Sequence, residues 1–346
     1  MVPLLSLLPA VRLAPSASRR LVVPLVIALA LAAAVPPALP APAAARVVQA
    51  TAPAAALVTA LGSRSATRDA PVPADLRPAL WAATRDYPKP YRDGCHVEQE
   101  GGAPPYSRCL YADRSAQTTI VLFGDSHALS WFPAVERVAI DRGWRLLSVT
   151  MSACTPADIP AYIPRIEAAS AACADWREAA LHLIARVHPA VVLAAGTRGF
   201  ATTDDHGNVV AGAERTAIWE AGIRRTIDRL KDSAGEVIWI ADTPISRPDR
   251  PACLASHPRS TLACATPVKY AVNTTWLNEE YYVSQAEGVG FIDPSLWICP
   301  TSPCPAVIGR VQLYRDGGHL TATFMGTLRT RLGRAVDAYL ESSTPS

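Results

Sequence analysis

The sequence lacks the features of a nucleic-acid-binding protein. Its 33 lysine and arginine residues are nearly balanced by 30 acidic residues, which gives a formal net charge of only +3. No segment interleaves basic with aromatic residues, the pattern that contacts phosphates and stacks on bases. We therefore expect no nucleic-acid partner.

Several common ligand-binding motifs are missing as well. The chain has no Cys-x-x-Cys pair of the kind found in zinc sites, and no cluster of histidine and carboxylate at the spacing of metal ligands. It also has no glycine-rich loop of a recognised phosphate-binding type and no internal repeat. We expect neither a metal ion nor a cofactor.

The N-terminus has the pattern of an export or anchor signal. Arginines at 19 and 20 precede an apolar run over residues 21–35, and residues 43–45 are alanines that suit a cleavage site. The run is shorter than the roughly 20 residues of a membrane span, which favours a signal peptide. An uncleaved membrane anchor is the alternative. We expect residues 1–45 to place the chain outside the cytoplasm, secreted or anchored to the cytoplasmic membrane by one N-terminal segment.

Eight cysteines support the same compartment. Their number allows roughly a hundred connectivities, so the sequence alone does not prove a pairing. An exported protein with an even count is nevertheless typical of a disulfide-bonded fold, in which each bridge contributes about 2–4 kcal/mol. The expected pairs join cysteines that are close in sequence: Cys95–Cys109, Cys154–Cys173, Cys253–Cys264 and Cys299–Cys304.

The remaining chain divides by composition. Residues 46–85 are rich in alanine, proline and threonine, and we interpret them as a linker. Residues 86–346 are expected to form the folded domain, over which residues 81–113 lie as an irregular cover.

Short apolar strands and amphipathic helices alternate five times from residue 118 onward. Strands are expected at 118–123, 144–150, 190–195, 236–241 and 290–292, and helices at 131–141, 175–187, 214–231, 269–287 and 321–340. Such strands are apolar throughout because both faces of their sheet are covered. The pattern predicts an α/β fold with a doubly wound parallel sheet, whose ligands bind beyond the carboxyl ends of the strands.

One serine lies at that edge. Ser126 follows the first strand in the turn Gly-Asp-Ser-His, and Asp316 and His319 stand near the C-terminus, before the last helix. A histidine activates a serine hydroxyl when a carboxylate fixes its tautomer, so these residues are a candidate catalytic triad. Residue type alone favours the simpler interpretation that Ser126 caps the next helix and that His319 lies in a surface turn.

The local sequences resemble those of the SGNH hydrolase (GDSL-like) superfamily, and in particular the SGNH domain that is fused to acyltransferase-3 membrane proteins. The matching segments are Gly124-Asp125-Ser126-His127-Ala128, Ser152-Ala153-Cys154-Thr155-Pro156, Cys173-Ala174-Asp175-Trp176, Asp293-Pro294 with Trp297-x-Cys299-Pro300, Cys304-Pro305 and Tyr314-Arg315-Asp316-x-x-His319-Leu320-Thr321. The resemblance implies a flavodoxin-like three-layer α/β/α fold with a central five-stranded parallel sheet. It also implies Ser126 as nucleophile, His319 as general base and Asp316 as the acid that orients it.

The oxyanion hole departs from the family pattern. Many SGNH enzymes place an asparagine after the third strand, where this chain reads Gly196-Thr197-Arg198. The hole would then use the backbone N–H of Ser126 and one from Gly196 or Thr197. Arg198 is either a further donor to the substrate or a solvated loop charge, and His127 either contacts substrate or packs within the loop.

Three functions remain open from the sequence. The first is an extracytoplasmic O-acyltransferase, most simply an O-acetyltransferase, that moves an acyl group from an acylated donor to a cell-envelope glycan such as a polysaccharide. The fused relatives carry about ten membrane helices, so a separate multi-span membrane acyltransferase would be its partner. The second is a carbohydrate O-acetylesterase with water as acceptor, and the third is a glycan-binding module with a degenerate site.

Overall fold

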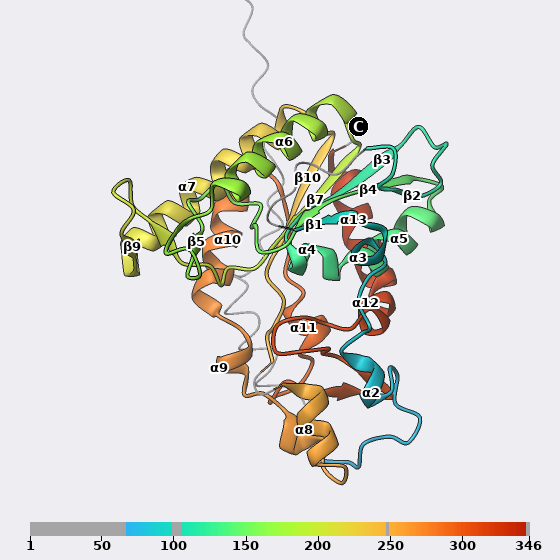
Figure 1. The fold of residues 1–346 in the computed structure, drawn as a ribbon. Helices are drawn as coiled ribbons and strands as arrows, with labels where there is room; N and C mark the ends of the chain where they lie inside the picture. The colour runs from blue at the N-terminus through green and yellow to red at the C-terminus, as the bar shows by residue number, and fades with distance from the viewer. Residues whose placement is uncertain (1–66, 99–105, 247–248, 344–346) are drawn as a thin grey trace, which may run out of the picture. The chain divides into compact units, whose positions relative to one another are not determined.

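The computed structural model describes residues 67–98, 106–246 and 249–343, which all belong to one compact unit, Val47–Ser346 (Figure 1). Its strands are β1 (His96–Val97), β2 (Leu110–Ala112), β3 (Thr119–Gly124), β4 (Arg145–Met151), β5 (Tyr162–Ile163), β6 (Ala168–Ala169), β7 (Val191–Ala195), β8 (Thr202–Thr203), β9 (Val209–Val210), β10 (Glu236–Ile240), β11 (Gly290–Ile292), β12 (Val307–Ile308) and β13 (Val311–Gln312). Its helices are α2 (Leu80–Ala83), α3 (Pro90–Asp93), α4 (Ser126–Ser130), α5 (Phe132–Asp141), α6 (Ala171–Val187), α7 (Gly212–Lys231), α8 (Arg250–Ser256), α9 (Val268–Ala271), α10 (Thr274–Ala286), α11 (Ser295–Ile298), α12 (Ala322–Thr327) and α13 (Arg329–Ser343), with a 3-10 turn at Leu262–Cys264.

The central sheet confirms the predicted α/β class. In the described residues it has the strand order β1-β4-β3-β7-β10-β11, with β2 paired antiparallel to the outer side of β4. The five predicted strands are β3, β4, β7, β10 and β11, and they pair in parallel. Because all six residues of β3 are buried, its apolar run has no polar face.

Two further strands correct the expected irregular cover. Segment 94–113 contributes β1 and β2, which pair with different parts of β4. A disulfide between Cys95 and Cys109 joins the two strands where they approach β4. They cover what would otherwise be an unpaired sheet edge, which proteins avoid because it invites association.

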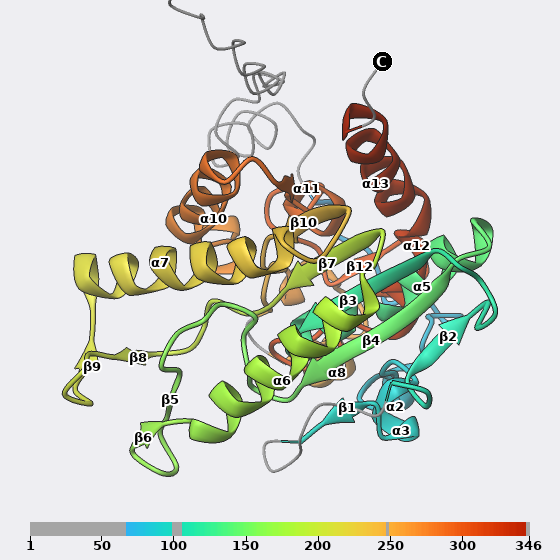
Figure 2. The ribbon, with the colours of Figure 1, turned by 90° about the horizontal axis from the view of Figure 1, so that it is seen from above.

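Helices cover both faces of the sheet, as Figure 2 shows. Helices α5, α12 and α13 pack on one face, whereas α6 and α7 lie on the other and α10 packs beside α7 and β11. The core between these layers holds four fully buried tryptophans: Trp131, Trp176, Trp219 and Trp239.

Two predicted helices are interrupted. The predicted helix 269–287 is divided into α9 and α10, because Val272 is extended and the Asn273 side chain caps α10. The predicted helix 321–340 consists of α12 and α13, and Thr321 caps α12 by accepting a hydrogen bond from the Phe324 N–H.

Part of the expected linker is packed against the domain. The Val72 N–H donates to the Pro258 carbonyl, and Arg77 forms a parallel bridge with Val311. Helix α2 lies beside α8, away from the sheet (Figure 1). Residues 67–85 are therefore not free chain, and the folded region begins before residue 86.

Within the described ranges, no helix combines the length and the apolar composition that a membrane span requires. The expected export segment, residues 1–45, lies outside these ranges, as does the first part of the linker.

Candidate active site

Ser126 is held at the sheet edge by the turn between β3 and α4. Asp125 caps α4, because its Oδ1 accepts from the backbone N–H of His127 at 2.8 Å and of Ala128 at 3.4 Å. Ser126 is then the first helical residue, so the cap is Asp125 and the Ser126 side chain is left for other contacts.

Gly124 makes this turn feasible. Its φ is +142°, and a Cβ at this position would lie 1.8 Å from the carbonyl oxygen of Ala195 on β7. Strand β3 can approach β7 this closely only without a side chain.

We expect Gly124→Ala to lower the free energy of unfolding by more than about 4 kcal/mol, because neither backbone can move without breaking the sheet. Urea unfolding followed by circular dichroism measures it. Gly326→Ala is the control: its Cβ would lie 3.9 Å from the nearest atom, within α12, and we expect it to be neutral or stabilising by up to about 1 kcal/mol. Equal stability of the two variants would contradict the close approach.

The structure brings Asp316 and His319 to Ser126. His319 Nε2 lies 2.9 Å from Ser126 Oγ, and His319 Nδ1 lies 3.0 Å from both carboxylate oxygens of Asp316. An ionised carboxylate only accepts hydrogen bonds, so the network assigns the proton to Nδ1 and leaves Nε2 to accept from the serine hydroxyl.

The turn itself positions the acid. Asp316 Oδ1 accepts the backbone N–H groups of Gly318 at 2.8 Å and of His319 at 2.7 Å. Burial alone would raise the pKa of Asp316, but these bonds and His319 hold it well below its usual value. Asp316 therefore stays ionised, as an orienting acid must.

A second histidine–carboxylate pair lies beside the first. His127 Nδ1 is 2.7 Å from Asp242 Oδ1, and the rings of His127 and His319 meet edge to face at 5.2 Å between centroids. Sequence reasoning missed Asp242. The sequence could have indicated it, because Asp242 follows the predicted strand at 236–241 and therefore lies at the same carboxyl edge of the sheet as Ser126.

The loop after β7 directs its polar groups inward. Thr197 donates its N–H to Asp125 Oδ2 at 2.8 Å and its hydroxyl to Asp242 Oδ2 at 3.0 Å. The expectation that the Thr197 N–H serves the oxyanion hole is therefore corrected, because Asp125 already accepts it. The suggested donors Ser126 N–H and Gly196 N–H stay predictions.

A family model described as "SGNH domain (fused to AT3 domains)" matches residues 94–333, more than half of the sequence. The chain belongs to this SGNH family. No curated protein matches the sequence closely enough to count as a relative.

Of three similar solved structures, the first has a TM-score above 0.5 and shares the fold. The periplasmic domain of a lipopolysaccharide acetyltransferase from Salmonella ser. Paratyphi A is 18% identical with a TM-score of 0.51, over 65% of this chain and 86% of that one. Est24, a carbohydrate acetylesterase from Sinorhizobium meliloti, is 14% identical with a TM-score of 0.38, over 64% and 99% of the two chains. A catalytic mutant of Axe2, an acetylxylan esterase from Geobacillus stearothermophilus, is 14% identical with a TM-score of 0.38, over 65% and 96%.

Arg198 of this SGNH domain has its side chain inside the domain. Its side chain is fully buried, forms an ion pair with Glu279, and lies 4.4 Å over the ring of Trp219. It is therefore not a solvated charge, and its guanidinium is directed into the α7–α10 layer rather than to Ser126.

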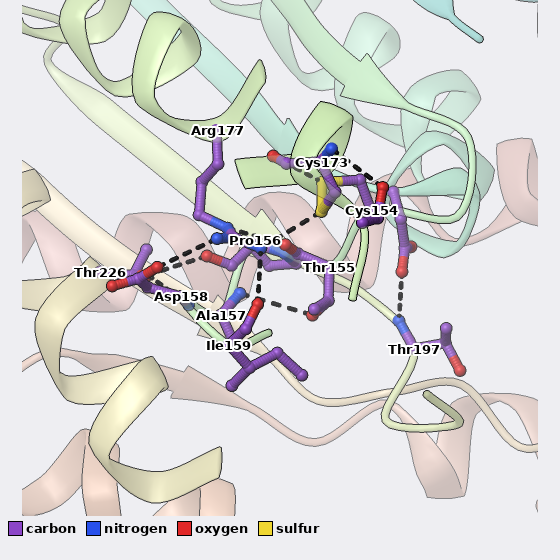
Figure 3. The surroundings of a disulfide bond; sticks show 12 residues. Cys154, Thr155, Pro156, Ala157, Asp158, Ile159, Cys173, Arg177, Thr197 and Thr226 are labelled. Atoms are coloured by element: carbon purple, nitrogen blue, oxygen red, sulfur yellow. Dashed lines mark hydrogen bonds and ion pairs between the residues drawn. A yellow bond between two sulfur atoms is a disulfide. The ribbon is translucent and has the colours of Figure 1, made fainter. Parts of the chain in front are cut away.

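A disulfide-bonded loop, drawn in Figure 3, packs against the loop after β7. All four expected disulfides form, and Cys154–Cys173 closes the loop after β4. Buried Arg177 lies within hydrogen-bond distance of carbonyl groups of this loop, and the Thr226 hydroxyl donates to the Pro156 carbonyl. Pro156 thereby packs against Gly196, where a Cβ would lie 2.5 Å from its Cδ.

The remaining cysteine cluster is not a metal centre. Among the described residues Cys253, His257 and Cys264 lie close together, but both sulfur atoms belong to one disulfide and offer no thiolate.

A cleft of about 850 Å³ opens beside Asp242. Its walls come from the loops after β7 and β10 and from α9 and α10, and they combine the aromatic rings of Tyr270 and Trp276 with polar groups of Asn273 and Thr274. Tyr270 is 58% exposed. The SGNH domain thus has a mixed polar and aromatic cleft that reaches Asp242, the partner of His127.

Proposed function

We propose that this SGNH domain is an extracytoplasmic serine O-acyltransferase that places an acyl group, most simply acetyl, on a hydroxyl of a cell-envelope glycan. The observation that carries the proposal is the continuous hydrogen-bonded chain Ser126–His319–Asp316. Four disulfides support the compartment, because such bonds persist in oxidising environments.

The geometry suits a two-step transfer. Ser126 Oγ attacks the acyl carbonyl while its proton moves to His319 Nε2, and the tetrahedral intermediate collapses as His319 protonates the departing oxygen. The product is an ester on Ser126. An acceptor hydroxyl then gives its proton to His319 and attacks that ester. The bond between the acyl carbon and Oγ breaks as His319 returns the proton to Oγ, which releases the acylated acceptor and restores Ser126.

The relatives support an acylated donor supplied at a membrane. The family is described by its fusion to AT3 domains, and one solved structure of this fold is named as part of a lipopolysaccharide acetyltransferase. We propose that a separate multi-span membrane acyltransferase presents the donor to this domain.

An O-acetylesterase is the second candidate, and exposure of the site favours it. The His319 and Asp316 side chains are 25% and 38% exposed, so water reaches the base that activates the acceptor. The acyl-serine is the same in both reactions, and only the acceptor differs.

The test uses the purified protein, p-nitrophenyl acetate as donor and a purified envelope polysaccharide as acceptor. Mass spectrometry is expected to detect acetyl on Ser126 and then on the polysaccharide, and neither should form with Ser126→Ala. If acetate is released and no acetyl group reaches the polysaccharide, the protein acts as an esterase. If wild-type protein and Ser126→Ala are equally inert, and no serine-directed probe labels Ser126, the catalytic proposal fails in favour of a binding module.

We place the glycan in the cleft beside Asp242, with an exposed ring available to stack on a sugar. Tyr270→Ala is expected to raise KM for the polysaccharide acceptor several-fold and to leave p-nitrophenyl acetate hydrolysis unchanged. Tyr282→Ala is the matched control, because Tyr282 is 56% exposed on α10 and does not line the cleft. Equal KM values for the two variants would contradict the proposal that the glycan binds in this cleft.

A further inference from the structure

The site lacks a side-chain donor where many SGNH enzymes place an asparagine. In the loop after β7, Asp125 accepts the Thr197 N–H, and Asp242 accepts both the Thr197 hydroxyl and the Arg198 N–H at 3.1 Å. The Arg198 guanidinium is turned to Glu279. The two backbone N–H groups and the hydroxyl are therefore not left to bind an oxygen that becomes negative during attack by Ser126, and the guanidinium lies against Trp219 and Glu279.

His127 is a polar side chain close to Ser126. It follows Ser126 directly on α4 and is 8% exposed. Its ring contacts that of His319, whose Nε2 in turn lies 2.9 Å from Ser126 Oγ. The imidazole of His127 is therefore beside the reacting atoms, at the end of the strand that carries the nucleophile.

The two nitrogen atoms of His127 have different surroundings. Nδ1 is bound to Asp242 at 2.7 Å, whereas Nε2 lies on the opposite side of the ring, 3.8 Å from the point where a Cβ on Gly318 would be. Among the described residues, none accepts a hydrogen bond from Nε2. A proton on Nε2 is thus a donor that the protein itself leaves unused.

The carboxylates around His127 keep that proton in place. Burial by itself lowers the pKa of His127, but Asp242, Asp125 and Asp316 outweigh it and raise the pKa to about 9. These groups come from the loop after β10, the turn before α4 and the turn before α12. On the other side, the basic ring of His319 contacts His127. At neutral pH the ring is an imidazolium that donates from both nitrogen atoms.

We infer that His127, held by Asp242, donates from Nε2 to the acyl carbonyl oxygen as negative charge develops there, in place of the absent asparagine. This inference rests on the proposed acyl transfer at Ser126. The contact is a hydrogen bond that strengthens in the transition state, with no net proton transfer, and the Ser126 N–H supplies a second donor at the start of α4.

His127→Leu removes the donor and is expected to lower kcat/KM for p-nitrophenyl acetate by about 10²–10³-fold. His127→Gln keeps an amide N–H on a side chain of similar reach and should recover part of that loss. His182→Gln, on the exposed face of α6, is the control and should match wild type. Thermal unfolding shows which variants fold, and the Gln variant carries the test if the Leu variant does not.

The pH profile separates this role from mere packing. The charged form is present below a pKa of about 9 and is lost above it, so wild-type kcat/KM should fall as pH rises through that value. The fall should be absent in His127→Gln and should move to lower pH in Asp242→Asn, which weakens the charge that holds the proton. Wild-type rates and an unchanged alkaline limb in both His127 variants would overturn the inference while leaving Ser126 catalysis intact. If the proposed function itself is wrong, wild-type protein will be as inactive as Ser126→Ala.

Discussion

Ser126→Ala is expected to lower kcat for p-nitrophenyl acetate by about 10⁶-fold, as removal of the nucleophile does in serine hydrolases. The reason is chemical: without Oγ no ester forms, and His319 is left 2.9 Å from a position that no longer carries a proton to accept. The decrease in kcat is measured from p-nitrophenol release by the purified protein. Mass spectrometry shows whether the peptide that carries residue 126 is acylated.

The fold should survive this change. Asp125 caps α4 and Ser126 does not, so alanine at the first helical position keeps the cap intact. We expect Ser126→Ala to unfold within a few degrees of wild type. A residual rate within tenfold of wild type in a folded variant would show that another group forms the acyl intermediate.

Asp316→Asn is expected to lower kcat by about 10⁴-fold. Asparagine can still accept the backbone N–H groups of Gly318 and His319 through its carbonyl oxygen, so the turn should be preserved. Its amide, however, neither fixes the proton on His319 Nδ1 nor stabilises the imidazolium that forms when Ser126 is deprotonated. The base is then held in the wrong tautomer.

Asp204→Asn provides the matched control for this prediction. Asp204 also accepts backbone N–H groups, from His206 and Asn208, but it lies in an exposed turn between β8 and β9. We expect full activity from this variant. If Asp316→Asn kept wild-type kcat while Asp204→Asn also did, Asp316 would be a residue of the turn alone.

Local signals were enough to predict the main sheet and to select the triad residues. Each of the five central strands is a short apolar run, and the segments around Ser126 and Asp316 carry motifs that can be recognised within a few residues. The parallel order of the strands then follows from the alternation with helices. That order places Ser126 at the ligand-binding edge.

Features that depend on contacts between distant parts of the chain could not be predicted from the sequence. The sequence places Asp242 at the carboxyl edge of the sheet, but nothing near it indicates that His127 will bind it across 115 positions of sequence. The direction of a backbone N–H is also not encoded locally, which is why Thr197 was expected to face the substrate although it faces Asp125. Arg198 was misjudged for a similar reason, since its buried partner Glu279 lies on a distant helix.

The four disulfides have a consequence for how the chain matures. Their partners are 14, 19, 11 and 5 positions apart, and in every case the partner is simply the next cysteine along the chain. A polypeptide that leaves a membrane pore N-terminus first exposes its thiols in the same order. An oxidant that joins each new thiol to the one before it produces the native set without reshuffling, so the chain is suited to a compartment that has a strong oxidase and little isomerase.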